Sequence, residues 1–370
     1  MRFLIALAAS IALVATSASA QTTPATGEAV FVMSGGGWGH GVGMPQYGAS
    51  GQANEGKTYQ QILAYYYSGT ELGAASSRWL RVLLAEGRPV VTVGSDAPFT
   101  AQGPTGPKHK VTGTLALKPN LRFKGAKGSV TAGSPLVIRP GKGAFLSYDG
   151  KAYRGRFEVQ RSGTRLSVIN VVPLDAYLQG VVPSEMPFGW PAEALKAQAI
   201  AARTYALGRV AKGKPYHLVS DVRDQVYRGI GGEKPSTNDA VRATAGKVVL
   251  YGGKLATTYY YSSSGGKTAN AADVFGFAVP YLVSKPDPWD KHSPHHKWSL
   301  QIDDAALATK LGAAGRAVDA IASSTPSGRV RALTVQTAAG QKQVEGTDAR
   351  MALGLRSTYM TVGVLRLDRV

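Results

Sequence analysis

Residues 181–207 read VVPSEMPFGWPAEALKAQAIAARTYAL. Pro191 suits the first turn of a helix, because it lacks only an N–H that would be unpaired there. Small and apolar residues then recur at helical spacing: Leu195, Ala199, Ala202 and Ala206. The pattern predicts a helix whose small-residue face packs closely against a neighbour.

The residues before this helix place one carboxylate, Glu185, among Val, Met, Pro, Phe and Trp. A buried carboxylate is costly unless it is protonated or paired. Desolvation raises a carboxyl pKa, and a general acid that works near neutral pH needs a raised pKa. Glu185 could equally cap the following helix, whose positive N-terminal end favours an anion. The local chemistry leaves both interpretations open.

The segments on either side indicate a mixed fold. Residues 79–172 alternate short Val-, Leu- and Phe-rich runs with Gly, Pro and Ser turns, which predicts an all-β module. A strand is expected from Ala29 to Met33, before the glycine-dense residues 35–43, and a helix from Thr58 to Tyr67. Further elements are expected as a hairpin around Gly252-Gly253, a helix over 303–311 and a hairpin from 329–336 and 341–345. The fold class is therefore α+β.

The first twenty residues resemble an export signal. Arg2 precedes an apolar run from Phe3 to Val14, and Ala18-Ser19-Ala20 gives a small-x-small cleavage pattern. This run is too short to span a bilayer, and no later stretch approaches the ~18 apolar residues that a spanning helix needs. We expect a secreted protein of the cell envelope that begins at Gln21 and has no integral membrane segment.

The composition indicates which partners the chain can attract and which cysteine-based reactions it cannot perform. With 42 Lys and Arg against 23 Asp and Glu, the net charge is +19. Nucleic acid is the usual partner of such a chain, but an exported protein rarely meets it, so we expect none. Attraction to an anionic wall polymer is favoured instead, with simple solubility as the alternative. The absence of cysteine excludes thiolate nucleophiles, CxxC redox chemistry and thiolate zinc sites.

Two other patterns imitate ligand sites. Residues 264–268 end like a phosphate-binding loop, but Tyr261 stands where that loop needs glycine, so no nucleotide cofactor is expected. Three histidines and two aspartates gather in a proline-rich tract, at His292, His295, His296, Asp287 and Asp290. These types can bind zinc, but no helix is expected to preset their geometry. A solvated loop is the favoured interpretation.

Residues 181–207 closely resemble the signature block of the SpoIID/LytB family (stage II sporulation protein D and amidase enhancer). Similar blocks follow in order at 262–268 (SSSGGKT), 279–282 (VPYL) and 353–358 (LGLRST). The resemblance implies a two-lobed catalytic core with a β-rich insertion. It divides the chain into a signal peptide (1–20), an N-terminal segment of the core (21–78), a β-rich module (79–172) and the SpoIID-like catalytic core (173–370).

The resemblance also implies an activity, because characterised members include lytic transglycosylases whose catalytic residue is the glutamate of the SEMP block. Glu185 matches that residue. Residues expected to bind or shape the site for the glycan are Thr268, Tyr281, Ser263, Ser264, Gly265, Gly266, His40 and Gln46. Some members hold zinc through one His and two Cys, and this chain has no cysteine, so no metal is carried over. The partner is then a peptidoglycan glycan strand.

One carboxylate suffices for this reaction. Ordinary glycosidases need two, but a lytic transglycosylase uses the muramic acid's own 6-hydroxyl as a tethered nucleophile. The product is a 1,6-anhydro-muramyl end. The family name also covers a second function, that of a non-catalytic wall-binding protein that stimulates an N-acetylmuramoyl-L-alanine amidase. That interpretation stays open, as does any part in sporulation.

The order of the blocks departs from the family. A block like GWGHGVGMPQYGA (37–49) commonly lies at the C-terminal end, after GLRST, with serine where this chain has Pro45. We therefore expect a circular permutation, which is tolerated when the old termini lie close together. It predicts that Ala29–Met33 pairs with residues 359–367 and that His40 lies near Glu185. The alternative is a separate N-terminal hairpin with a structural histidine.

Overall fold

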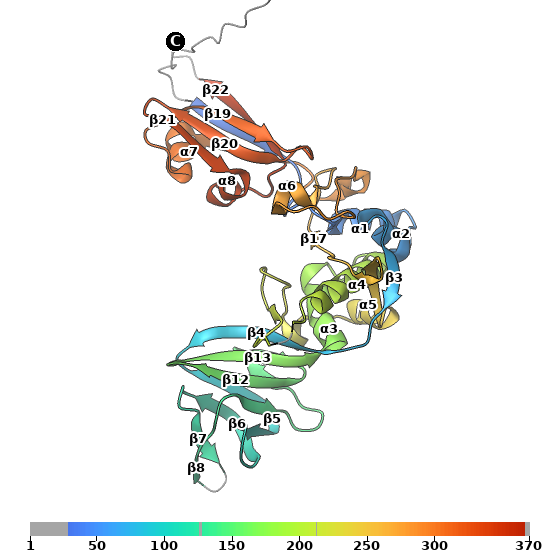
Figure 1. The fold of residues 1–370 in the computed structure, drawn as a ribbon, viewed down its shortest axis with the longest axis vertical. Helices are drawn as coiled ribbons and strands as arrows, with labels where there is room; N and C mark the ends of the chain where they lie inside the picture. The colour runs from blue at the N-terminus through green and yellow to red at the C-terminus, as the bar shows by residue number, and fades with distance from the viewer. Residues whose placement is uncertain (1–28, 126–127, 212, 367–370) are drawn as a thin grey trace, which may run out of the picture.

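The computed structural model describes residues 29–125, 128–211 and 213–366. It confirms the mixed α+β class. The strands of the C-terminal part lie at one end of an elongated molecule, the helices lie in the middle, and the strands that follow residue 79 lie at the other end (Figure 1). The segment expected to be a signal peptide lies outside the described residues.

Ten consecutive strands form the β-rich end. Most belong to one curled sheet in the order β11-β10-β5-β9-β12-β13-β4-β14, with β6 paired to β5, while β7 and β8 form a separate hairpin. The strands are β4 (Trp79–Arg88), β5 (Val91–Gln102), β6 (His109–Leu117), β7 (Arg122–Gly125), β8 (Gly128–Thr131), β9 (Leu136–Arg139), β10 (Leu146–Tyr148), β11 (Lys151–Tyr153), β12 (Arg156–Ser162) and β13 (Arg165–Pro173); β14 (Leu218–Val219) joins the edge.

Helix α3 (Leu174–Glu185) packs against this sheet. Helices α4 (Ala192–Gly208) and α5 (Pro235–Ala243) pack against α3 and against each other, and the short 3-10 helix η1 (Gly229–Gly232) lies beside α3. The predicted helix α4 is confirmed, and Ala199, Ala202 and Ala206 are fully buried in the same core as the sheet. Close packing is possible because alanine keeps the two backbones near each other.

The central part joins residues from both halves of the chain. Its elements are β2 (Met44–Pro45), α1 (Gln46–Asn54), α2 (Tyr59–Tyr66), β3 (Glu71–Ala74), β15 (Lys247–Tyr251), β16 (Lys254–Leu255), β17 (Tyr260–Tyr261), α6 (Ala271–Phe275) and the 3-10 helix η2 (Pro288–His292). Thr58 caps α2, because its hydroxyl accepts from the Gln61 N–H and the Gln61 side chain returns to the Thr58 N–H. The predicted hairpin around Gly252-Gly253 is confirmed as β15–β16.

The C-terminal end contains two three-stranded sheets, β18-β1-β22 and β19-β20-β21, with α7 and α8 beside them. Its elements are β1 (Ala29–Gly35), β18 (Trp298–Asp303), α7 (Asp304–Leu311), β19 (Ala317–Ser324), β20 (Val330–Thr337), β21 (Gly340–Glu345), α8 (Gly346–Leu353) and β22 (Met360–Arg366). The predicted pairing of β1 with the last strand is confirmed, from Ala29 opposite Arg366 to Gly35 opposite Met360. This pairing carries the glycine block that follows β1 toward the central part.

None of the helices in the described part of the chain combines the length and the apolar character that crossing a membrane requires.

Candidate active site

A pocket of about 400 Å³ lies between the helices and the central part. Its lining comes from the glycine block, the ends of α3 and α4, the loop before η1, β17 and α6. The lining residues are His40, Glu185, Tyr205, Arg209, Val222, Arg223, Asp224, Val226, Tyr259, Tyr260 and Phe275. The structure thus brings two sequence-predicted residues, His40 and Glu185, to one cavity.

Glu185 is the last residue of α3, and its side chain is half-buried. Its Oε1 accepts a hydrogen bond of 2.7 Å from the Val226 N–H, while Oε2 has no hydrogen-bond partner among the described residues. Burial raises the pKa of Glu185, and the Val226 N–H and the charge of Arg228 oppose this shift. The negative end of the α3 dipole also disfavours an ionised carboxylate here.

The helix-cap interpretation of Glu185 is wrong. The residue before α4 is Pro191, and no side chain caps that helix end. Glu185 instead ends the preceding helix, which the sequence did not predict because Pro183 argues against a helix. Pro183 is tolerated near the C-terminal end of α3, where few further backbone bonds depend on the helix.

A buried glutamine positions the N–H that contacts Glu185. Gln225 is fully buried. Its side-chain amide donates to the Tyr260 hydroxyl at 2.9 Å and to the Ala202 carbonyl, and its Oε1 accepts from the Tyr177 hydroxyl at 3.1 Å. These bonds hold the neighbouring Val226 against α3.

The pocket's second acid is fully engaged. Asp224 Oδ1 accepts from the Tyr205 hydroxyl at 2.8 Å and lies 3.3 Å from the Arg209 guanidinium. Asp224 Oδ2 accepts from the Val219 N–H at 2.9 Å. Since both oxygens are occupied and a cation neutralises the charge, Asp224 is suited to holding this wall rather than to proton transfer.

His40 presents a neutral imidazole to the pocket. Its Nδ1 accepts from the Val42 N–H at 3.1 Å, so the proton lies on Nε2, which donates to the Tyr260 carbonyl at 3.2 Å. Burial and the nearby Arg329 charge lower the pKa of His40 to about 4. The ring lies among Tyr261 and Phe275, with centroids 5.2 and 5.5 Å away.

The glycine block approaches other protein segments closely. A Cβ on Gly43, whose φ is +82°, would lie 2.1 Å from the Tyr259 carbonyl oxygen. A Cβ on Gly41, whose φ is +90°, would lie 2.2 Å from the Arg329 guanidinium. These glycines are required because no side chain fits between the block and β17 or the C-terminal end of the molecule.

The 262–268 loop is anchored by two aspartates. Asp290 accepts from the Ser263 hydroxyl and from the N–H groups of Ser264 and Gly265, and it contacts His296 Nδ1 at 3.1 Å. Asp287 accepts from the hydroxyls of Ser264 and Tyr66 at 2.7 and 2.9 Å. Both aspartates are fully buried. The solvated-loop interpretation is therefore wrong for them: a serine-rich loop supplies the donors that make their burial possible.

The other predicted binding residues do not line the Glu185 pocket. Thr268 is buried, with its Oγ1 accepting from the Lys285 N–H at 2.8 Å, and the Tyr281 hydroxyl accepts from the Thr257 N–H at 2.7 Å. Gln46 is buried in the first turn of α1. Gly265 and Gly266 continue the anchored loop beyond Ser264. Their roles toward a glycan stay predictions.

Several residues that line the Glu185 pocket were not predicted from the sequence. The wall formed by Tyr205, Arg209 and Asp224 joins the end of α4 to a loop that carries no motif. The Tyr259-Tyr260-Tyr261 run just before the serine loop was the one available signal for the aromatic wall. Within the described ranges, no three His, Asp or Glu side chains are grouped so as to hold a metal ion.

The fold and the pocket define a class: a mixed α+β protein with an aromatic-lined pocket in which one carboxylate, Glu185, keeps an oxygen without a hydrogen-bond partner among the described residues. Residues 162–251, which include Glu185, match the sequence model of the SpoIID family, described as "Stage II sporulation protein". The chain is 37% identical over 203 residues to "Amidase enhancer" of Bacillus subtilis (strain 168) and 34% identical over 206 residues to "Stage II sporulation protein D" of the same organism. The predicted resemblance to the SpoIID/LytB family is thereby confirmed over these matched residues.

The matched parts are limited in extent. They cover 54% and 50% of this chain, and only 28% of the amidase enhancer and 59% of the stage II sporulation protein D. An uncharacterized protein of Brachyspira hyodysenteriae is 39% identical over 140 residues, or 37% of this chain and 38% of that protein. The permuted block order stays a prediction.

Proposed function

We propose that this chain is a peptidoglycan lytic transglycosylase of the cell envelope, with Glu185 as its acid and base. The observation that carries the proposal is the pairing of a raised Glu185 pKa with an unengaged Oε2 in a pocket whose other acid, Asp224, has both oxygens occupied. A pocket with one available carboxylate suits a reaction whose nucleophile the substrate supplies.

The reaction proceeds by one bond exchange at the anomeric carbon of N-acetylmuramic acid. Protonated Glu185 gives its proton to the glycosidic oxygen as the bond to N-acetylglucosamine breaks. The 6-hydroxyl oxygen of the muramic acid attacks the anomeric carbon, and its proton passes to the Glu185 carboxylate. The products are a 4-hydroxyl end and a 1,6-anhydro end, and Glu185 returns to its starting state.

The neutral side chains of the pocket support this chemistry. Because the pKa of His40 is lowered to about 4, no histidine cation opposes the positive charge that develops on the sugar. The rings of Tyr259, Tyr260 and Phe275 offer apolar surface to sugar faces. Val226 keeps Glu185 oriented through its N–H.

The similarity to the protein named "Amidase enhancer" supports a second proposal, in which the chain binds wall polymer and stimulates an amidase without cutting glycan. In that case Glu185 would be dispensable. The two proposals differ in whether glycan strands alone are cleaved.

Digestion of purified glycan strands, followed by mass spectrometry, separates them. The parent is expected to release anhydro-muramyl fragments, and Glu185→Gln to release about 10²- to 10⁴-fold fewer. Glu86→Gln makes the same chemical change at an exposed site on β4 and serves as the matched control. Equal cleavage by parent and Glu185→Gln, or no cleavage by the parent, would remove the transglycosylase proposal.

A further inference from the structure

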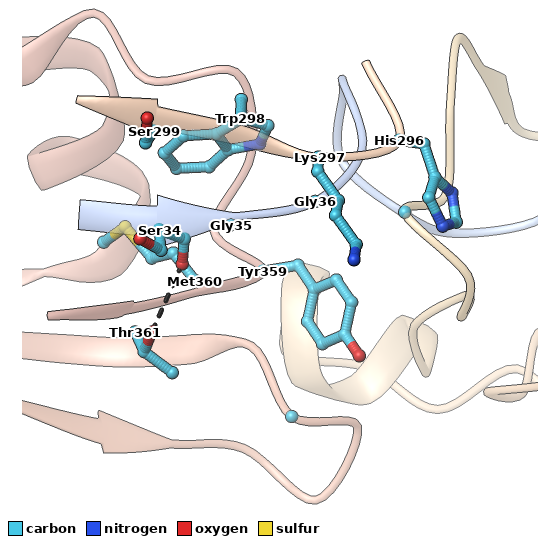
Figure 2. A pocket seen from close by; sticks show the side chains of 12 residues that line it. Ser34, Gly35, Gly36, His296, Lys297, Trp298, Ser299, Tyr359, Met360 and Thr361 are labelled. Atoms are coloured by element: carbon cyan, nitrogen blue, oxygen red, sulfur yellow. Dashed lines mark hydrogen bonds between the residues drawn. The ribbon is translucent and has the colours of Figure 1, made fainter. Parts of the chain in front are cut away.

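A second pocket, of about 650 Å³, lies at the end of β1, where the glycine block of residues 35–43 begins (Figure 2). It shares no lining residue with the Glu185 pocket. Its volume falls within the range of small-ligand sites. Its lining comes from β1, β18, the start of β22, the turn before β20 and the serine loop: Ser34, Gly35, Gly36, Gly265, His296, Lys297, Trp298, Ser299, Gly328, Tyr359, Met360 and Thr361.

Two aromatic side chains flank the end of β1. Figure 2 shows Trp298 on one side of Gly35 and Tyr359 on the other. The Trp298 indole N–H donates to the Gly37 carbonyl at 3.1 Å, and a Cβ on Gly35 would lie 2.4 Å from the indole. The ring is therefore held in place by a hydrogen bond and by the strand beneath it. A rigid aromatic ring loses little entropy when a ligand packs on it.

The floor is formed where the two glycine-rich segments cross. A Cβ on Gly265, whose φ is +71°, would lie 2.4 Å from the carbonyl carbon of Gly36. A Cβ on Gly36 would lie 2.8 Å from the His296 carbonyl oxygen. The crossing admits no side chain, so the cavity between the two aromatic residues stays open. Hydroxyls of Ser34, Ser299 and Thr361 add polar groups to the lining.

The charges around this pocket are mainly positive. Lys297 is exposed and has no ion-pair partner among the described residues. The buried Arg329 guanidinium lies 5.6 Å from the centroid of the Tyr359 ring. Its three nitrogens have no hydrogen-bond partner within the described part of the chain. Asp290 opposes them, but it already receives donors from Ser263, Ser264, Gly265 and His296. An anion is therefore favoured here.

The two pockets lie at opposite ends of one short segment. Gly36 lines the second pocket and His40 lines the first, four residues later. Even a fully extended chain spans only about 14 Å over that distance. The exposed Trp38 lies between Gly36 and His40 in the sequence.

We propose that the second pocket is a subsite for a carboxylate-bearing sugar unit of a glycan strand, in which Trp298 and Tyr359 contact the sugar ring and Lys297 pairs with the carboxylate. The ligand class rests on the proposed function, since it takes the glycan as substrate. The subsite itself concerns binding and needs no cleavage.

Calorimetric titration of the full chain tests the subsite with two probes of equal length, an oligosaccharide that contains N-acetylmuramic acid and a neutral chito-oligosaccharide. Lys297→Met is expected to weaken binding of the acidic probe about tenfold, which is the effect of losing one charge-assisted hydrogen bond, and to leave the neutral probe unchanged. Trp298→Ala is expected to weaken both. Lys291→Met, at an exposed lysine of η2, is the matched control.

The outcomes separate the subsite from the catalytic proposal. Selective loss of the acidic probe in Lys297→Met supports the subsite even if the parent cuts no glycan. Equal binding of both probes by the parent, Lys297→Met and Trp298→Ala overturns it even if strands are cleaved, as does the absence of binding to the parent. Because Lys297 is exposed, Lys297→Met keeps the test valid if Trp298→Ala fails to fold.

Discussion

The half-buried Glu185 and the fully buried pair Asp287–Asp290 are acids with opposite hydrogen-bonding arrangements. Glu185 has one hydrogen bond, from the Val226 N–H, and lines a 400 Å³ pocket. Asp287 and Asp290 are fully buried and receive donors from two serines, a tyrosine, a histidine and two backbone N–H groups. The same functional group can thus be left available for reaction or used up in holding a loop.

The difference shows how partners distinguish a reactive carboxylate from a structural one. A buried carboxylate costs stability unless donors replace its water. The 262–268 loop supplies those donors at Asp290. By contrast, α3 and the 224–228 loop give Glu185 a single hydrogen-bond donor, the Val226 N–H. Substitutions should therefore affect activity at one site and stability at the other.

The largest effect is expected for Glu185→Gln. Activity on glycan strands should fall about 10²- to 10⁴-fold, because the amide cannot donate a comparable proton. The fold should remain, since the amide oxygen can still accept from Val226. A folded-state pKa raised above the ordinary 4.5 means that the carboxyl favours folding below that value and loses this contribution as the pH rises through the folded pKa. The stability of the variant relative to the parent should therefore rise between pH 4 and pH 8.

Thermal denaturation across that pH range measures the relative stability. A Glu185→Gln protein with a strongly reduced midpoint at pH 8 would show that the carboxylate is structural, like the aspartates.

Asp290→Asn should mainly reduce stability. The NH₂ group of the new amide would face N–H and O–H groups that now donate hydrogen bonds to Asp290. Breaking a buried charged network lowers the free energy of unfolding by about 3–5 kcal/mol. Asp221→Asn removes a carboxylate whose side chain is 49% exposed and paired with Arg223, and should cost under about 1 kcal/mol. Urea denaturation of the two variants gives the comparison. Similar losses in both would mean that the Asp290 network contributes little.

Asp287 should give the parent a pH-dependent stability. Burial raises the pKa of Asp287 to about 6 from an ordinary 3.8, so its contribution is complete below 3.8 and is lost as the pH rises through about 6. The loss should be no more than about 3 kcal/mol. Asp287→Asn should remove this component from a plot of unfolding free energy against pH. An unchanged slope between pH 4 and pH 7 in the variant would exclude Asp287 as its source.

The smallest effect is expected for Gln225→Ala. Loss of the bonds to Tyr177, Tyr260 and Ala202 should loosen the loop that carries Val226. Because the Val226 N–H lowers the Glu185 pKa, loosening it should raise that pKa further. The activity decline at high pH, where the acid is lost, should then move to higher pH. A pH–rate profile measures this shift, and a profile that changes only in height would assign Gln225 a purely structural role.

The sequence predicted local features better than the walls of the site. Helix α4 and the hairpins follow from spacing and turn residues, and the β1–β22 pairing followed from the displaced glycine block. Helix α3 was not predicted, because it contains Pro183 and a proline usually interrupts a helix. The free-energy cost of a proline in a helix depends on how near it lies to the helix end. Asp224 and Gln225 carry no local pattern, since their partners lie on α3, α4 and β17. The prolines around Asp287 suggested solvation, and only the folded loop reveals the donors.

The most direct test of the central claim is the fate of water oxygen during cleavage. Glycan strands are digested by the parent in water enriched in the heavy oxygen isotope, and the new ends are analysed by mass spectrometry. Attack by the muramic acid's own 6-hydroxyl predicts anhydro-muramyl ends without the heavy isotope. New reducing ends that carry it would show that water is the nucleophile and would contradict a single-carboxylate transglycosylase at Glu185.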